Sequence, residues 1–208
     1  MTRDWNQRYA TGETPWDTGQ PDPHLVDLLD SDEIAPCRVL EIGCGTGANA
    51  LLLAERGFDV TALDLSSLAI ERARASGAAA GASVDFRVHD FLAEDPDGGP
   101  FELVVDRAVW HVFDAAEDRA RFAARVAKQL VVGGRWFTIA GSTEGPERDH
   151  GPPRRSARDL ADAIEPSLEL VWLREAEFAG DLPTSTRAWL ALARRRVLPA
   201  QPSTLREE

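Results

Sequence analysis

The chain has little of several residue types, and each shortage excludes a class of protein. Its 208 residues include only two cysteines, Cys37 and Cys44, which are too few for a disulfide framework, so free thiols are expected. No stretch approaches the run of about 20 apolar residues that crosses a membrane. The first residues also lack the apolar core of a secretion signal. We therefore expect a cytoplasmic protein that does not associate with a membrane.

Positive charge is also scarce. The 23 Lys and Arg residues are outnumbered by 35 Asp and Glu residues, which gives a formal net charge of −12 at pH 7. Because nucleic acids are bound by basic surfaces, no nucleic-acid partner is expected. Lysine occurs only at Lys128, whereas arginine and alanine are frequent, a bias that points to a GC-rich bacterial genome. The four histidines show no metal-ligand spacing, so no metal site is expected.

What the chain does have is an apolar run that ends in three glycines. Residues 39–42 precede the glycine turn 43–47, and the apolar stretch 48–54 follows it. The next apolar run, 60–63, ends at Asp64. A strand, a glycine turn, a helix and a second strand ending in a carboxylate form half of a nucleotide-binding α/β sheet. The glycines let the backbone approach a ligand, and Asp64 is placed to accept hydrogen bonds from ribose hydroxyls.

The glycine spacing distinguishes two classes of cofactor. A dinucleotide site has the pattern G-x-G-x-x-G, with the pyrophosphate at the helix N-terminus. Here the pattern is G-x-G-x-G with Glu41 before the first glycine, and positions 49 and 50 hold no glycine. The run Glu41 to Gly47 resembles motif I of class I S-adenosylmethionine-dependent methyltransferases. The resemblance implies S-adenosyl-L-methionine as cofactor and S-adenosyl-L-homocysteine as product.

Strands and helices are expected to alternate along most of the chain. The expected strands are 38–43, 58–63, 84–88, 101–106, 135–140, 168–175 and 187–196. The expected helices are 24–30, 47–56, 66–76, 115–130 and 156–164. Ser66 is a candidate N-cap, Asp114-x-x-Glu117 resembles a capping box, and Gly133-Gly134 resembles a C-terminal stop. The alternation predicts a parallel sheet covered on both faces, with ligands bound at the carboxyl ends of the strands.

The domain organisation is expected to be simple. Residues 1–198 form one domain, of which 1–24 are an N-terminal arm, and 199–208 form a flexible tail. The last two strands have no helix between them, which is similar to the methyltransferase ending with an antiparallel last strand. The fold class is therefore expected to be α/β, with a Rossmann-like, mostly parallel sheet of seven strands. Nothing in the sequence requires a dimer, so a monomer is expected and a dimer stays open.

The N-terminal arm indicates a particular group within this family. The pattern Trp5-x-x-x-Tyr9-x-x-Gly12-x-x-Pro15-Trp16-Asp17-x-Gly19 resembles the opening of the thiopurine and thiol methyltransferase group, which includes plant thiol and halide methyltransferases. The pair Asp106-Arg107 after the fourth strand and the closing Ala188-Trp189-Leu190 are similar to the same group. The resemblance covers nearly the whole chain.

The resemblance also implies roles for individual residues. The arm folds over the cofactor, so Trp5 and Trp16 contact or shield it. The other implied cofactor-binding residues are Glu41, Gly43 and Gly45 at the methionine end, Asp64 and Leu65 beside the ribose, Asp90 and Phe91 at the adenine, and Arg107. The implied catalytic residues are Asp106, Arg107 and His111. The acceptor is a small molecule.

Sulfur is the favoured acceptor atom. A thiol with a pKa of about 8.5 needs little help to ionise, whereas an alcohol or amine acceptor needs a base. The first interpretation is S-methylation of a thiol metabolite, xenobiotic or natural product. O- or N-methylation with His111 as base is an alternative, and a non-catalytic S-adenosylmethionine-binding protein is another.

Each singled-out residue also has a purely structural interpretation. Trp5 and Trp16 could simply pack the arm on the sheet. Arg107 could form a surface ion pair, and His111 could be a core histidine bonded to a backbone carbonyl. A basic loop cluster could be a solvated loop or a rim that attracts an anionic acceptor; its members are Arg148, His150, Arg154 and Arg155.

Overall fold

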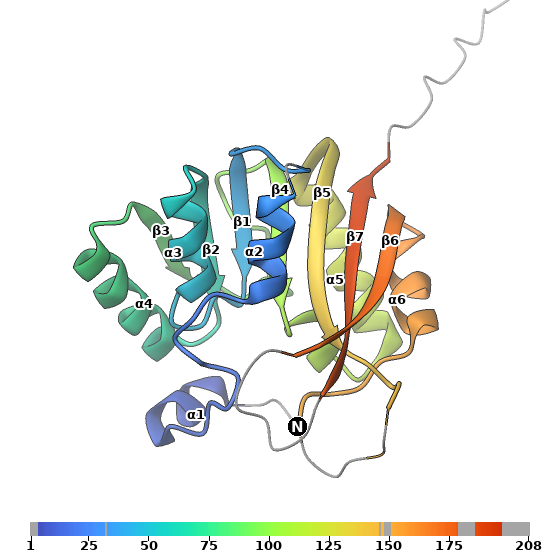
Figure 1. Cartoon of the computed structure of the whole chain (residues 1–208), viewed down its shortest axis with the longest axis horizontal. Helices are drawn as coiled ribbons and strands as arrows, with labels where there is room; N and C mark the ends of the chain where they lie inside the picture. Colours follow the sequence, from blue (N-terminus) through green and yellow to red (C-terminus); the bar gives the residue numbers. More distant parts are fainter. Residues whose placement is uncertain (1–3, 32, 146, 148–150, 179–185, 197–208) are drawn as a thin grey trace, which may run out of the picture.

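The structure is a computed structural model that describes residues 4–31, 33–145, 147, 151–178 and 186–196 (Figure 1). The expected tail, 199–208, lies outside these residues, as do Arg148 and His150 of the basic loop cluster. None of the described helices combines the length and the apolar character that crossing a membrane requires.

A seven-stranded sheet runs through the molecule in the order β3-β2-β1-β4-β5-β7-β6 (Figure 1). Its strands are β1 (Arg38–Ile42), β2 (Asp59–Asp64), β3 (Val84–Val88), β4 (Phe101–Arg107), β5 (Leu130–Gly141), β6 (Leu168–Glu177) and β7 (Arg187–Arg195). Strand β7 is antiparallel to both β5 and β6, and the pairs from β3 to β5 are parallel. The expected fold class, a mostly parallel Rossmann-like sheet with an antiparallel last strand, is therefore confirmed.

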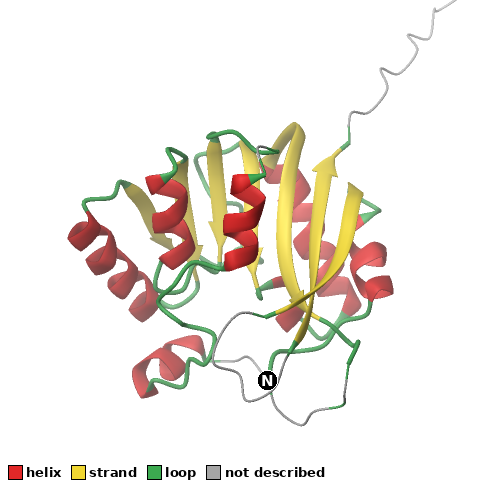
Figure 2. Cartoon of the chain, viewed as in Figure 1, coloured by secondary structure: helices red, strands yellow, loops and turns green. Residues whose placement is uncertain are grey.

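Helices cover both faces of this sheet (Figure 2). One apolar core lies under α2 (Pro23–Asp30), α3 (Ala48–Glu55) and α4 (Ser67–Ala80), and the other lies under α5 (Ala116–Gln129) and α6 (Ala157–Ile164). Alternate residues of β1 face the two cores, because Val39 belongs to the first and Leu40 to the second. A strand buried on both faces must be apolar throughout, which explains the continuous apolar run before the glycines.

The start of α5 differs from the expected capping box. The helix begins at Ala116, and its N-cap is Ala115, which has no side-chain hydrogen bond. The Asp114 carboxylate lies one residue too early to cap the helix, and it accepts a hydrogen bond from Arg155 at 2.9 Å instead. The capping-box prediction was therefore wrong, since a distant arginine competes for the carboxylate.

The end of α5 was also predicted wrongly. The helix ends at Gln129 and β5 begins directly at Leu130, so the Gly133-Gly134 pair lies inside the strand. Gly133 has a φ of +80°, a conformation that favours glycine. The register between β4 and β5 shifts at this place, between Phe101 and Leu103. The two glycines therefore form a bulge in the strand, because a bulge needs the same backbone freedom as a helix stop.

Two helices differ from their expected extents. A short helix, α1 (Trp5–Thr11), lies in the arm, where no element was expected; Asp4 caps it and Gly12 ends it with a φ of +75°. Seven residues are too few for a periodic pattern to stand out. Helix α4 is capped by Ser66 as expected, but it runs on to Ala80, because Gly77 is packed inside it against Phe86.

Candidate active site

The expected site residues gather at one edge of the sheet, where β1, β2 and β4 end. Figure 1 shows α1 and the arm below this edge, beyond the lower ends of the strands. In an open parallel sheet this edge carries the ligand site, because helix N-termini and loop backbones point toward it.

The glycine loop, residues 43–47, connects β1 to α3. Gly43, Gly45 and Gly47 all have positive φ, and the amides of Gly43 and Cys44 donate to the Leu63 carbonyl at 2.7 and 2.9 Å. A Cβ atom on Gly43 would lie 2.2 Å from a methyl carbon of Val109, which follows β4. The loop therefore requires glycine both for its backbone conformation and for close packing.

Asp64, the last residue of β2, holds the same loop. Its Oδ2 accepts a hydrogen bond from the Gly45 amide at 2.8 Å, and its Oδ1 accepts one from the Ser66 amide at 2.8 Å. Burial raises the pKa of this carboxyl, while both hydrogen bonds act to lower it. Each carboxylate oxygen has a further lone pair with which to bind a hydroxyl. The neighbouring Leu65 is 49% exposed, an unusual position for leucine that suits an apolar ligand surface.

Glu41, at the end of β1, carries an orphaned carboxylate oxygen. Its side chain is buried and Oε2 has no hydrogen-bond partner. Burial raises its pKa to about 8; Asp64 raises it further, and a hydrogen bond from Asn49 and the charge of Arg107 lower it. A buried, unpartnered acceptor is costly unless a ligand supplies a donor. An ammonium group would satisfy this oxygen.

Glu41 should make the stability of the ligand-free protein depend on pH. Its pKa is about 8 in the folded protein against an ordinary 4.5, so between these values the folded state keeps a proton that the unfolded state has released. The stability that the protonated Glu41 carboxyl contributes is fully present below pH 4.5 and is lost as the pH rises through about 8. We therefore expect the melting temperature of Glu41→Gln, measured against that of the wild type at the same pH, to increase as the pH rises between these two pKa values. The exposed Glu55→Gln is the control, and a constant difference for Glu41→Gln would contradict the account.

The arm is docked on the start of α4. The Asn6 Oδ1 accepts hydrogen bonds from the Ser66 hydroxyl at 2.7 Å and from the Leu68 amide at 3.2 Å. The Arg72 guanidinium donates to the Tyr9 carbonyl at 2.9 Å. These contacts fix α1 beside the same turn that receives the Asp64 carboxylate. The arm is thus held next to the site by polar contacts as well as by packing.

An aromatic cluster of the arm lies against the glycine loop. Tyr9 is 3% exposed, and its hydroxyl oxygen accepts a hydrogen bond from the Trp16 indole at 3.2 Å. The Trp5 and Trp16 rings meet edge to face, with centroids 5.6 Å apart. A Cβ atom on Gly45 would lie 2.9 Å from the Tyr9 hydroxyl oxygen. The two tryptophans therefore reach the site through Tyr9, which lies directly over the loop.

Arg107, at the end of β4, forms a buried ion pair and not a surface one. Its Nε lies 2.5 Å from Oδ2 of Asp22, whose side chain is fully buried. Its Nη1 donates to the Trp16 carbonyl at 3.1 Å, and the guanidinium carbon lies 5.7 Å from the centre of the Phe178 ring. Arg107 therefore ties β4 to the arm, and the surface-pair interpretation is wrong.

Asp106 holds the turn that follows β4. Its side chain is fully buried, and Oδ1 accepts hydrogen bonds from the amides of Val109 and Trp110 at 3.2 and 3.0 Å. Oδ2 accepts one from the Trp136 indole at 2.9 Å. Ala108 between them has a φ of +64°, which costs about 1 kcal/mol for a residue with a Cβ atom. These contacts favour a role for Asp106 in shaping the turn.

His111 is buried in the 3₁₀ helix η1 (Trp110–Val112). The Gly141 amide donates a hydrogen bond to its Nδ1 at 2.7 Å, so a backbone N–H is one partner of the ring. A backbone N–H can only donate, so Nδ1 is unprotonated and the neutral ring carries its proton on Nε2. The ring centre lies 5.9 Å from that of Phe178, which places His111 and Arg107 around one aromatic side chain.

Asp90 and Phe91 follow β3. The exposed Asp90 accepts hydrogen bonds from the amides of Leu92 and Ala93 at 3.0 and 3.1 Å, so it caps its own turn. The Phe91 ring is buried in the core, 5.1 Å from the ring of Phe122. With the Phe91 ring in the core, the expected adenine contacts at this place are the Asp90 carboxylate and the backbone of Phe91.

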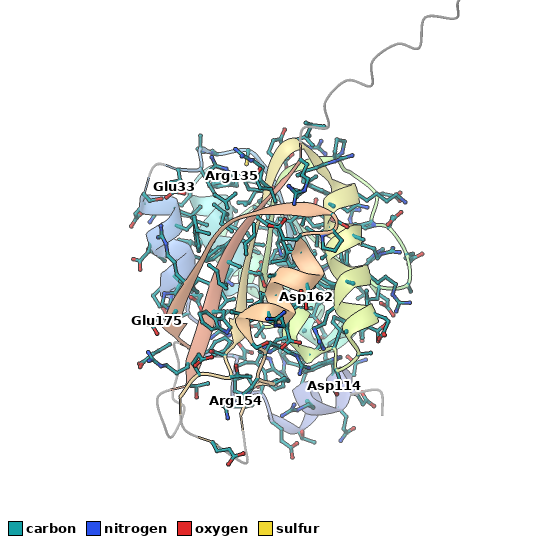
Figure 3. All side chains as sticks on the ribbon, turned by 90° about the vertical axis from the view of Figure 1, so that its right-hand side faces the viewer. Glu33, Asp114, Arg135, Arg154, Asp162 and Glu175 are labelled. Atoms are coloured by element: carbon teal, nitrogen blue, oxygen red, sulfur yellow. The ribbon has the colours of Figure 1, made fainter. Side chains whose placement is uncertain are left out.

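The described part of the basic loop cluster is bound into the loop that follows β5. Arg154 Nε donates to the Ser142 carbonyl at 3.1 Å. Arg155 donates to the Phe113 carbonyl at 3.0 Å and pairs with Asp114 at 2.9 Å. Figure 3 shows Arg154 and Asp114 at the same end of the molecule as α1. These arginines connect the turns around the site.

The structure places further residues here that were not among the predicted site residues: Tyr9 and Asp17 of the N-terminal pattern, and Asp22, Thr46 and Asn49. The Thr46 hydroxyl donates to Asp17 at 2.7 Å, and the Asp22 amide donates to Asn49 at 2.8 Å. Asp22 before Pro23 is a typical helix start, a signal that could have identified the cap. The pairing of Asp22 with Arg107 has no local signal.

These features define an α/β protein that binds an adenosyl cofactor. They are the glycine loop, Asp64 and the orphaned Glu41 carboxylate, which lie at the edge of a sheet with an inserted antiparallel strand. Residues 39–134 match a family model described as a methyltransferase domain. The chain belongs to the class I S-adenosylmethionine-dependent methyltransferases, whose cofactor is S-adenosyl-L-methionine.

Three relatives illustrate this membership. A probable thiol methyltransferase 2 of Arabidopsis thaliana is 31% identical, over 72% of this chain and 65% of the relative. A ubiquinone biosynthesis O-methyltransferase of Xylella fastidiosa is 32% identical, over 69% of this chain and 61% of the relative. This chain therefore spans just under two thirds of the length of each. A solved structure titled "Conversion of a Disulfide Bond into a Thioacetal Group during Echinomycin Biosynthesis" is 30% identical, with a TM-score of 0.78 over 88% of this chain and 84% of that one.

Proposed function

We propose that the protein transfers the methyl group of S-adenosylmethionine to the thiolate sulfur of a small molecule. The observation that carries the choice of sulfur is the hydrogen bond from the Gly141 amide to His111 Nδ1, at 2.7 Å. It leaves the neutral ring with its proton on Nε2, so His111 offers a donor and not a base. An acceptor that ionises without a base suits such a site. The name of the Arabidopsis relative supports the same choice.

The residues at the sheet edge fit the cofactor. Glu41 has the buried acceptor that an ammonium group would satisfy, and Asp64 has lone pairs for ribose hydroxyls. Gly43 and Gly45 bring the backbone close to the ligand. Leu65 offers an exposed apolar surface beside the ribose position. We assign these residues, with the Asp90 carboxylate and the backbone of Phe91, to cofactor binding.

The arm would exclude water from the reacting groups. When bound, the cofactor supplies a methyl group on a positively charged sulfur. Tyr9 lies over the glycine loop with Trp16 and Trp5 packed beside it, and Arg107 fastens the arm through the Trp16 carbonyl. A positive sulfonium and a negative thiolate lose their charges in the transfer, so a dry site favours the transition state. Aromatic faces nearby add attraction for the sulfonium.

Positioning would supply most of the remaining catalysis. Asp106 holds the turn 108–110 by hydrogen bonds to two of its amides, and this turn packs against Gly43 through Val109. The turn therefore links the acceptor side to the cofactor side. A fixed in-line geometry replaces much of the entropy cost of bringing two reactants together. We assign Asp106 to positioning, His111 to the acceptor side, and Arg107 to the place where the acceptor side meets the amino-acid end of the cofactor.

The alternative is O-methylation with His111 as base, and the name of the Xylella relative, an O-methyltransferase, favours it. His111→Asn separates the two, because the asparagine amide oxygen can still accept from the Gly141 amide. We expect the variant to turn over a thiol acceptor within about 3-fold of the wild-type rate. The dependence of this rate on pH should have the same shape in both proteins, because no histidine has to lose a proton for the reaction. A loss of about 100-fold or more would establish His111 as a base and overturn S-methylation without a base.

A further inference from the structure

A chain of buried polar side chains connects the glycine loop to the end of β4. The Asn49 side chain lies beside the Glu41 carboxyl group and lowers its pKa, and Asn49 Oδ1 accepts a hydrogen bond from the Asp22 amide at 2.8 Å. The Asp22 carboxylate in turn receives Arg107 Nε at 2.5 Å. The four residues come from β1, α3, the start of α2 and β4, and all of them meet at the cofactor edge. One continuous network therefore runs from Glu41 to Arg107.

The two middle members of this network are rigidly held. The Asp22 side chain is fully buried, and its Oδ1 caps α2 by accepting from the His24 amide at 3.0 Å. Helix α2 is anchored in turn by Leu25 and Leu28 in the core. Asn49 lies in the first turn of α3 and is 8% exposed. Two packed helix starts thus fix the distance between Glu41 and Arg107.

The two ends of the network are an acidic and a basic side chain. Glu41 has a buried carboxylate oxygen without a partner, and a guanidinium presents several N–H donors in a fixed plane. An α-amino acid zwitterion has the complementary pair, an ammonium for the carboxylate and a carboxylate for the guanidinium. We propose that Asp22 and Asn49 are positioning residues that hold Glu41 and Arg107 as one frame for the amino-acid end of the cofactor. This inference rests on the proposed function.

Two ligands test the frame, because only one of them has an amino-acid end. S-adenosylhomocysteine has it, whereas 5′-methylthioadenosine has the same nucleoside and sulfur without it. Asp22→Asn leaves one acceptor oxygen for two donors, His24 N and Arg107 Nε, and Asn49→Ala removes the link to Glu41. By isothermal titration calorimetry, we expect each variant to bind S-adenosylhomocysteine about 10-fold or more weakly than wild type. Binding of 5′-methylthioadenosine should change less than about 2-fold.

The matched control is Asp27→Asn, the same substitution at an exposed position of α2. It should bind both ligands as wild type does. Equal weakening of both ligands by Asp22→Asn and Asn49→Ala would overturn the proposal, because it is what a merely loosened fold produces. Unchanged binding would overturn it as well. A wild-type protein that methylates an acceptor but binds both ligands equally would reject the frame and leave the proposed function standing.

Discussion

Asp64→Ala should weaken the binding of S-adenosylhomocysteine by about 10- to 100-fold, or about 1.4–3 kcal/mol. The carboxylate is expected to hold the ribose through charge-assisted hydrogen bonds. It also orients the loop, since it accepts from the amides of Gly45 and Ser66, both at 2.8 Å. The loss should therefore lie toward the upper end of this range. Isothermal titration calorimetry measures it directly.

Two comparisons show where the effect of Asp64→Ala originates. Asp59→Ala removes an exposed carboxylate from the first position of the same strand and should leave affinity unchanged. Asp64→Asn keeps one acceptor oxygen, so its loss should fall between wild type and Asp64→Ala. If Asp64→Ala bound the ligand as tightly as wild type, the ribose would be held elsewhere.

Arg107→Ala should lower both turnover and stability. It leaves the fully buried Asp22 carboxylate without its partner at 2.5 Å, and an unpaired buried charge costs about 3–5 kcal/mol. For a chain of this size the melting temperature should fall by about 6–20 °C. Turnover should fall by about 100-fold or more, because the arm also loses its contact at the Trp16 carbonyl. Thermal melts and initial rates measured well below the new melting temperature check both effects.

A double variant separates the two effects of Arg107. Asp22→Asn combined with Arg107→Ala removes the stranded charge, so part of the lost stability should return. Turnover should stay low, because the arm is still unfastened. Recovery of turnover along with stability would reduce Arg107 to a structural residue. A wild-type rate in Arg107→Ala alone would exclude any role in the reaction.

The glycine loop and the strands around it could be predicted from the sequence because their signals are local. Glycines with positive φ, an apolar run buried on both faces and a carboxylate at the next strand end all lie within a short stretch, 39–64. The missing helix between β6 and β7 could also be predicted, and the antiparallel last strand was implied by the resemblance of this ending to that of methyltransferases. These features depend on backbone sterics and periodicity, which a single chain displays directly.

The polar network could not be predicted, because it joins residues that are far apart in the chain. Asp22 and Arg107 are 85 residues apart, and their pairing depends on how α2 packs against the sheet. The same reason explains why the predicted capping role of Asp114 was wrong: its carboxylate accepts a hydrogen bond from Arg155, which is 41 residues away. Competition between distant partners leaves no pattern in the sequence.

His111 shows what geometry adds to a residue that the sequence already singled out. From the sequence it could be a base or a buried core residue. The hydrogen bond from Gly141 assigns its protonated nitrogen, and that assignment supports an acceptor that needs no base. The choice between sulfur and oxygen therefore depends on one backbone amide on β5, a strand with no obvious link to His111 in sequence.

The central claim is methyl transfer to a thiol, and product formation tests it most directly. The purified protein would be incubated with S-adenosylmethionine and a panel of small thiols, phenols and amines, and S-adenosylhomocysteine would be quantified over time. We predict turnover with thiols at rates well above those with phenols and amines. Turnover confined to phenols or amines would contradict the claim and return His111 to the role of base. Binding of the cofactor without turnover of any acceptor would contradict it in favour of a non-catalytic binding protein.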